Sequence, residues 1–151
     1  MSFIDTILIF ILTISIIVTF HEYGHYIAAR LCGVKVLEFS VGFGNKLIGK
    51  KFGSDNTEYK ICALPLGGYV KMLDEREGKV NDFEKDRAFN NQSLLKRFII
   101  VFSGPLFNFI LAIFFYFLIF SSGYDGFMPK VGVVSPKSVA QEINMSPEDI
   151  I

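Results

Sequence analysis

Two long stretches without a charged residue dominate the hydrophobic pattern of this 151-residue chain. The first runs from Thr6 to Phe20, and a helix continuing from Thr6 to Leu31 would measure roughly 39 Å at the α-helical rise of about 1.5 Å per residue. The second fills 98–120, and about 20 apolar residues are enough to cross a bilayer. The pattern therefore predicts a transmembrane helix over 1–31 and another over 98–120.

The segment 32–72, between the two apolar stretches, has the shorter alternation that is typical of strands. Gly42 to Asn45 predicts a turn, and Pro65 predicts the end of a strand. We expect a membrane-associated β-region whose free strand edge could pair with an extended substrate; a small surface hairpin is the alternative. The runs that predict strands are Val36 to Val41, Tyr59 to Leu64 and Leu66 to Lys71.

The remaining segments are more polar. Residues 73–97 are predicted to be a charged cytoplasmic loop: Leu73 to Asn91 has no strong period, which is typical of a solvated loop, and Ser93 to Arg97 is a candidate start of the next helix. Within 121–151, Val131 to Val134 predicts a strand and Ser138 to Ile143 a short helix. About thirty residues are too few for an independent domain without added cross-links.

Composition and charge distribution agree with a membrane protein. Hydrophobic residues make up 51% of the chain, with 17 Phe and no Trp, and the net charge of zero gives no indication of a nucleic-acid partner. All Lys and Arg except Lys130 and Lys137 lie between Arg30 and Arg97. The positive-inside rule then places the connecting segment in the cytoplasm and both termini on the outer side.

The motif His21-Glu22-Tyr23-Gly24-His25 carries the candidate chemistry. Residues four apart share a helix face, so both imidazoles can bind one Zn²⁺ ion. Glu22 lies about 100° around the helix, where it suits a general base acting on a metal-bound water. Such a motif can arise by chance, but both histidines of the chain lie in it, and ionisable groups at a membrane edge are usually functional.

The second apolar stretch contains Gly104 and Asn108, which share a helix face at a spacing of four. A small residue permits close helix approach, and an Asn at membrane depth needs a polar partner. Two interpretations remain open: ordinary helix packing, or an active-site support in which Asn108 lies beside the metal helix and orients substrate or a catalytic group. Pro105 would locally open the backbone hydrogen-bond ladder.

Taken in order, these segments resemble the site-2 protease family of intramembrane zinc metalloproteases, in particular its bacterial branch of the regulator of sigma-E protease type. The resemblance covers nearly the whole chain. It rests on His21 to His25, Val41 to Gly44, Pro65 to Met72, Ala88 to Gln92, Gly104 to Asn108, and Val131 to Ile151, which is similar to the opening of a PDZ domain.

The resemblance implies roles for the matching residues. His21 and His25 would bind zinc, Glu22 would be the general base, and Asn108 would lie near the active site. The β-region would guide substrates, which in this family are transmembrane proteins such as anti-sigma factors. The lipid bilayer would be the other partner, and a bacterial inner membrane the location.

One element of the family pattern is missing from the sequence. The family's third zinc ligand is an Asp in an L-D-G motif on a later transmembrane helix, and this chain has no such motif. Glu38 and Asp55 are conceivable substitutes. We expect the N-terminal portion of a longer protease; a non-catalytic truncated relative or metal-binding partner is the alternative, and a plain two-helix membrane scaffold is a third.

Overall fold

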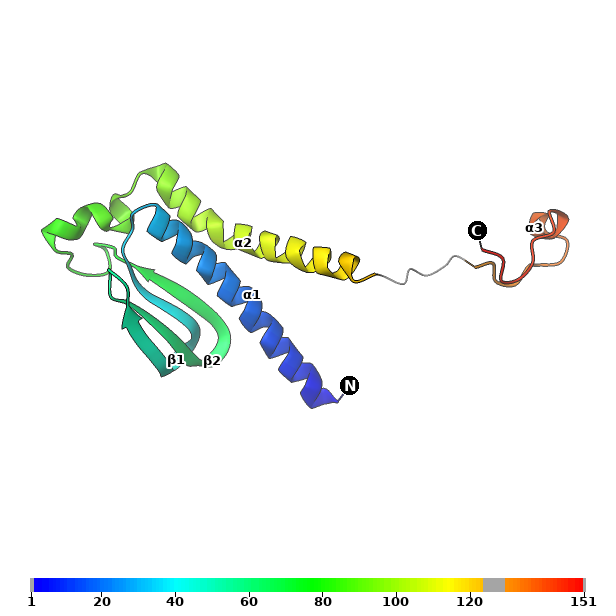
Figure 1. Cartoon of the computed structure of the whole chain (residues 1–151), viewed down its shortest axis with the longest axis horizontal. Coiled ribbons are helices and arrows are strands. Elements are labelled where there is room, and N and C mark those ends of the chain that lie inside the picture. Colours follow the sequence, from blue (N-terminus) through cyan, green and yellow to red (C-terminus); the bar gives the residue numbers. More distant parts are fainter. Residues whose placement is uncertain (1, 124–129, 151) are drawn as a thin grey trace. The chain divides into compact units, whose positions relative to one another are not determined.

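The computed structural model describes residues 2–123 and 130–150. The chain divides into two units, Met1–Phe115 and Tyr116–Ile151. In the first unit a long helix is followed by a bent sheet and then by a second long helix (Figure 1).

Helix α1, Phe3–Leu31, begins at a complete capping box. The Asp5 backbone N–H donates to Ser2 Oγ at 3.2 Å, and the Ser2 N–H donates to the Asp5 carboxylate at 2.8 Å. The helix ends before Gly33, whose φ of 84° is the left-handed conformation common after helix ends. Its 29 residues are long and apolar enough to cross a membrane.

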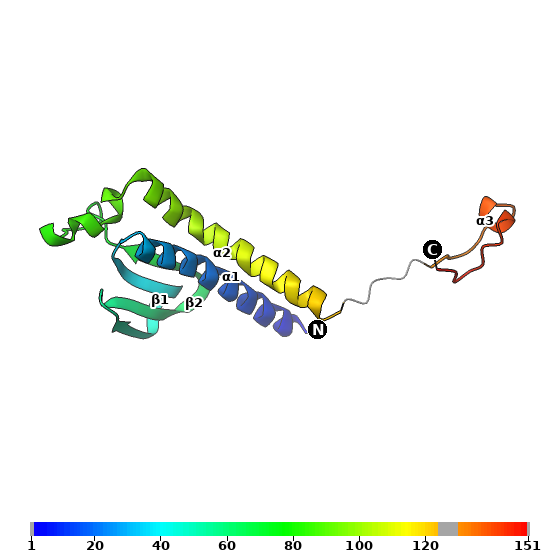
Figure 2. The same ribbon diagram turned by 45° about the horizontal axis from the view of Figure 1, so that its top comes forward.

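Helix α2, Leu94–Ser121, has 28 residues and meets the same criterion of length and composition. It remains one helix through Pro105. Figures 1 and 2 both show the first part of α2 beside α1. A Cβ atom added to Gly24 of α1 would lie 2.5 Å from the carbonyl oxygen of Ser103, so the two backbones meet at a distance that excludes a side chain.

Strands β1, Val36–Phe52, and β2, Thr57–Met72, form an antiparallel two-stranded sheet. The turn between them contains Gly53 and Asn56, with φ angles of 82° and 51°. Both strands are long and bent (Figure 1). Because they fold back on themselves, each contributes more than one segment to the width of the sheet.

The register defines four neighbouring segments within this sheet. Residues 38–41 pair with 68–71 on one side and with 58–61 on the other, while 48–52 pair with 57–61. The segment 38–41 is therefore central. The last segment of β2, ending at Met72, has its pairings on one side, which leaves it at the edge of the sheet within the described residues.

The turn predicted over Gly42 to Asn45 is wrong, because β1 continues through it. Gly42 and Gly44 have φ angles of 88° and 84°, and the register shifts here, so the strand bends as at a β-bulge. Strand β2 likewise continues through Pro65. The Pro65 carbonyl accepts a hydrogen bond from Ser15 Oγ of α1 at 3.1 Å, which holds this bend beside the helix.

The segment after β2 is more ordered than a solvated loop. It contains two 3₁₀ helices, Asp82–Arg87 and Phe89–Asn91, with Ala88 fully buried between them. The Leu73 N–H donates to the Lys35 carbonyl at 2.9 Å, which attaches the start of the segment to the entrance of β1.

The core of the first unit lies at the C-terminal end of α1. Its buried residues come from the last turns of α1, the entrance to β1 and the first turns of α2, so all three elements are fixed together just after the histidine motif. These residues are Ala28, Ala29, Val34, Val36 and Ile100.

The second unit contains a short helix, α3, Val139–Glu142, inside the predicted helical segment. The strand predicted over Val131 to Val134 is wrong. In the described residues this part of the chain forms only an isolated antiparallel bridge between Lys130 and Ile150. A hydrogen bond from the Val131 N–H to the Asp149 carbonyl at 2.8 Å accompanies the bridge.

Candidate metal centre

The two histidines of the motif lie together on α1. His21 Nε2 and His25 Nε2 are 3.2 Å apart, and the ring planes are inclined by 80°. Two imidazole nitrogens bound to one tetrahedral Zn²⁺ at about 2.0–2.1 Å would be separated by about 3.3–3.4 Å. The spacing of the two nitrogens therefore suits a single zinc ion.

Helix α2 faces this pair with three residues at a spacing of four. His25 Nδ1 donates to the Ile100 carbonyl oxygen at 2.7 Å, and Asn108 Nδ2 lies 3.2 Å from His21 Nδ1. His25 lies opposite Ile100, and His21, four residues earlier, lies opposite Asn108, eight residues later, so α1 and α2 are antiparallel here. Gly104 occupies the middle position, opposite the space between the two imidazoles.

The missing side chain of Gly104 leaves that space open. A Cβ atom at this position would lie 2.3 Å from His25 Nε2 and 2.7 Å from His21 Nε2. It would therefore occupy the place where an ion bound to both nitrogens belongs. The residues present fit a zinc ion in this respect, and the requirement for a small residue at position 104 has a direct chemical reason.

Glu22 lies in a cavity of about 440 Å³ that it shares with His25. The rest of the wall comes from the edge segment of β2, the charged loop after it, and the first turns of α2, and it includes Val70, Asp74 and Arg76. A polar wall of this kind gives water a place beside the carboxylate.

The edge segment of the sheet approaches the same carboxylate. A Cβ atom at Gly68 would lie 3.0 Å from Glu22 Cγ and 2.7 Å from the Ser40 carbonyl oxygen. The segment that follows, Val70 to Met72, lines the cavity. An edge strand and the candidate general base thus border one space.

The substitutes considered for a third zinc ligand are not at the histidines. Glu38 accepts hydrogen bonds from Lys60 Nζ at 2.6 Å and from Tyr69 Oη at 2.9 Å. The Lys60 ammonium, together with Tyr69, lowers the pKa of the Glu38 carboxyl below its usual value. Asp55 is also engaged elsewhere. Within residues 2–123 and 130–150, no group of three or more His, Cys, Asp and Glu side chains could hold a metal.

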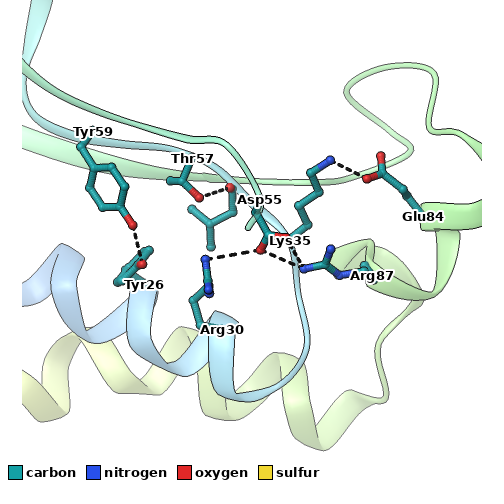
Figure 3. Close-up of polar contacts among 9 residues, drawn as sticks. Tyr26, Arg30, Lys35, Asp55, Thr57, Tyr59, Glu84 and Arg87 are labelled. Carbon is teal, nitrogen blue, oxygen red and sulfur yellow. Dashed lines mark hydrogen bonds and ion pairs between the residues drawn. The ribbon is translucent and has the colours of Figure 1, made fainter. Parts of the chain in front are cut away.

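Asp55 belongs instead to a polar cluster that joins the sheet to α1 (Figure 3). Arg87 Nη2 donates to both Asp55 carboxylate oxygens at 2.8 Å. Arg30 Nη1 lies 3.4 Å from Asp55 Oδ2. Nearby, Tyr26 and Tyr59 share a hydrogen bond of 2.5 Å. Burial is the larger cause, and this hydrogen bond the next, of a rise in the pKa of Tyr59 to about 12. The cluster fixes the β1–β2 turn to α1.

Several features of the site were not predicted from the sequence. The Ile100 carbonyl is a backbone group, although the spacing of four before Gly104 and Asn108 would have indicated its position. Asp74 and Arg76 were assigned to a solvated loop, and they line the cavity that holds Glu22. No local pattern indicates that part of the wall, because it depends on where the chain leaves the sheet.

A pair of apolar helices with a zinc-compatible pair of histidines is the arrangement expected of a membrane metalloprotease, and the sequence comparisons identify the family. The chain belongs to peptidase family M50, whose model matches residues 9–149.

Among its relatives, the regulator of sigma-E protease RseP of Escherichia coli K12 is 44% identical over 147 residues, which is 97% of this chain and 32% of that protein. A regulator of sigma E protease of Haemophilus influenzae is 44% identical over 97% of this chain and 33% of its own length. A Vibrio cholerae protein named as a candidate zinc metalloprotease is 50% identical over 91% of this chain and 30% of its own length. The chain thus spans about a third of these relatives.

Proposed function

We propose that this chain supplies the zinc-binding helix pair of an intramembrane zinc metalloendopeptidase of the site-2 protease type. The observation that carries the proposal is the pair of Nε2 atoms, 3.2 Å apart on α1, facing the open space at Gly104. His21 and His25 are the two ligands. Asn108 and Gly104 of α2 are the supporting residues.

Bound zinc would act as a Lewis acid on the scissile carbonyl and would lower the pKa of a nearby water. The residues of the chain do the rest. Glu22 takes a proton from the attacking water and passes it to the leaving amine. The Ile100 carbonyl holds His25 with Nδ1 protonated, so that Nε2 is left with a lone pair.

Catalytic zinc normally has three protein ligands besides the reacting water. The third ligand in this proposal is an aspartate outside the described residues, as the resemblance to site-2 proteases implies. The face of His21 supports this arrangement, because His21, Pro105 and Asn108 line an open apolar cavity of about 340 Å³. An apolar surface of this kind suits the packing of a further membrane helix against α1 and α2.

The substrate is a transmembrane segment of another membrane protein, such as an anti-sigma factor. A helix hides its own carbonyl groups, so the segment has to unwind before one of them reaches the metal. Among residues 2–123 and 130–150, the edge segment Gly68 to Met72 has strand pairings on one side only, so an unwound chain can add to it beside Glu22 as a further strand.

The proposed location is a bacterial inner membrane, crossed by α1 and α2 with the connecting sheet and loop on the cytoplasmic side. The excess of Lys and Arg between Arg30 and Arg97 supports this orientation. The C-terminal segment from Val131 onward would begin a PDZ-like domain on the other side.

The substitution Glu22→Gln tests the proposal. In the full native protein, reconstituted in vesicles with a transmembrane substrate, it should lower cleavage by about 10²–10⁴-fold, the usual contribution of a general acid–base group. Zinc content should stay unchanged, because Glu22 is not a ligand. Cleavage is followed by the appearance of product on gels and zinc by elemental analysis of the same sample.

The matched control is Glu142→Gln in α3, which makes the same chemical change at an exposed side chain of the second unit, outside the histidine motif. It should cleave at the normal rate. Normal cleavage by Glu22→Gln would exclude the assigned mechanism. An inactive wild-type protein that still binds zinc would favour the alternative of a non-catalytic metal-binding relative.

A further inference from the structure

Asn108 has one polar atom in use and one without a partner. Its Nδ2 lies 3.2 Å from His21 Nδ1. Its Oδ1 is buried and has no hydrogen-bond partner within the described part of the chain. A buried amide oxygen without a partner is destabilising, so the observed orientation of this side chain needs a reason.

The protonation of the two imidazoles supplies that reason. His25 must carry its proton on Nδ1, because it faces the Ile100 carbonyl oxygen at 2.7 Å, and a carbonyl can only accept. His25 Nε2 is then an acceptor, and in the absence of a metal the 3.2 Å contact between the two Nε2 atoms is a hydrogen bond when His21 carries its proton on Nε2. His21 Nδ1 is left as an acceptor, and the Asn108 amide N–H donates to it.

This pattern cannot persist when both Nε2 atoms bind a metal. A ligating nitrogen needs its lone pair, so His21 must move its proton from Nε2 to Nδ1. The Nδ1–H group then requires an acceptor. A half-turn of the Asn108 amide brings Oδ1 to the position of Nδ2, and the oxygen that has no partner becomes the acceptor.

We propose that Asn108 is a positioning residue that fixes the metal-binding tautomer of His21 by accepting a hydrogen bond from its Nδ1–H through Oδ1. The inference rests on the proposed zinc site and deepens it. Asn suits this role because one side chain offers both a donor and an acceptor, so the same contact is satisfied before and after the proton moves.

Ordinary helix packing does not require this arrangement. Packing at a crossing needs small or apolar side chains, and the closest approach here is already supplied by Gly24 against Ser103. Asn108 also borders an apolar cavity with Thr13 and Leu111. A leucine would fill that position at similar volume, so packing alone does not call for an amide there.

The decisive comparison is between Asn108→Leu and Asn108→Asp in the full native protein. The leucine variant has no acceptor and should bind zinc about 10–100-fold more weakly, the usual effect of losing the partner of a metal-bound histidine. The aspartate variant keeps an oxygen toward Nδ1 and should bind zinc at least as tightly as the wild type. Affinity is measured by competition with a chromophoric chelator.

The control is Thr13→Val, because Thr13 borders the same apolar cavity while its hydroxyl donates to the Ile9 carbonyl of its own helix. It should leave zinc affinity unchanged. The thermal midpoint of each metal-free variant, measured in parallel, separates weaker zinc binding from loss of the fold. If the leucine variant does not fold, Asn108→Ala replaces it in the comparison.

Two results would overturn the inference. If the leucine variant binds zinc like the wild type, His21 does not need the contact. If the aspartate variant is as weak as the leucine variant, the amide N–H is the group that matters. His21→Ala and His25→Ala separate this failure from a failure of the zinc site itself, since zinc binding that survives both would exclude the site as a whole.

Discussion

Helix α1 has two different neighbours, and it makes two different kinds of contact with them. Toward α2 its contacts are uncharged and close: His25 faces a backbone carbonyl, His21 faces an amide, and Gly24 touches the opposite backbone. Toward the sheet it makes one short contact, from Ser15 to the Pro65 carbonyl, and near its C-terminal end it uses longer polar side chains, with Tyr26 bonded to Tyr59 and Arg30 near Asp55 (Figure 3).

The difference follows from what each side has to do. A metal site between two helices needs backbones close together and side chains held at fixed angles, which small residues and short hydrogen bonds supply. The sheet has to be held beside the helix without filling the cavity at Glu22. The ion pairs of Asp55 and the Tyr26–Tyr59 pair fix the sheet to the C-terminal part of α1, and the Ser15–Pro65 hydrogen bond fixes its bend to an earlier turn.

The largest effect should come from adding one carbon on the α2 side. Gly104→Ala puts a Cβ atom where the proposed zinc ion would lie, 2.3 Å from His25 Nε2 and 2.7 Å from His21 Nε2. The atoms it meets are the ends of two imidazoles, which can rotate away, so the helix pair should remain folded. Zinc affinity should fall by at least about 100-fold, measured by chelator competition, with little change in the thermal midpoint.

The matched substitution is Gly24→Ala, whose added Cβ atom would meet the Ser103 carbonyl oxygen at 2.5 Å. Backbone cannot rotate away, so α1 and α2 must separate. This variant should lose thermal stability as well as zinc. If Gly104→Ala retained wild-type zinc affinity, the metal would not lie between the imidazoles and α2.

The sequence predicted the α2 side of this comparison far better than the sheet side. His21 with His25, and Gly104 with Asn108, follow from a spacing of four, so the residues that share a face of each helix were readable from the helical period, while the pairing of the two faces stayed one of two open interpretations. What periodicity does not give is the backbone: the Ile100 carbonyl and the contact at Gly24 appear only when the helices are packed.

The sheet side depends on pairings between residues distant in the sequence. The glycines at 42 and 44 predicted a turn, whereas they bend a continuous strand and let residues 38–41 pair on both sides. Asp55 and Glu38 were considered as ligands because a lone carboxylate carries no sign of its partner. Their arginine and lysine partners come from other elements, which local patterns cannot indicate.

The next effect in size should come from the sheet side. Asp55→Asn removes the charge that Arg87 and Arg30 share, and the Asp55 side chain is only 5% exposed. Hydrogen bonds to a charged group contribute about 1.5–3 kcal/mol, so the free energy of unfolding should fall by about 2–3 kcal/mol. Zinc affinity should change much less, since the histidines are held by α2. Chemical denaturation in detergent measures the free energy of unfolding.

The control for Asp55 is Asp82→Asn, which removes the partner of Lys85 at a side chain that is 87% exposed. Exposed pairs contribute about 0–1 kcal/mol, so this variant should unfold almost like the wild type. A loss of zinc binding by Asp55→Asn as severe as that of Gly104→Ala would mean that the two sides of α1 are not independent.

The smallest effect concerns acid stability, and it tests the sheet alone. Lys60 and Tyr69 lower the pKa of Glu38 in the folded protein, so Glu38 binds protons less readily there than in the unfolded chain. Its stabilising contribution is present above its unfolded pKa of about 4.3 and is lost as the pH falls through the lower folded value. Glu38→Gln should therefore be less stable than the wild type at neutral pH, and the difference should shrink as the pH falls below about 4.3. Thermal midpoints across this range measure the effect, and a difference that persists in acid would assign the role of Glu38 to packing rather than to its charge.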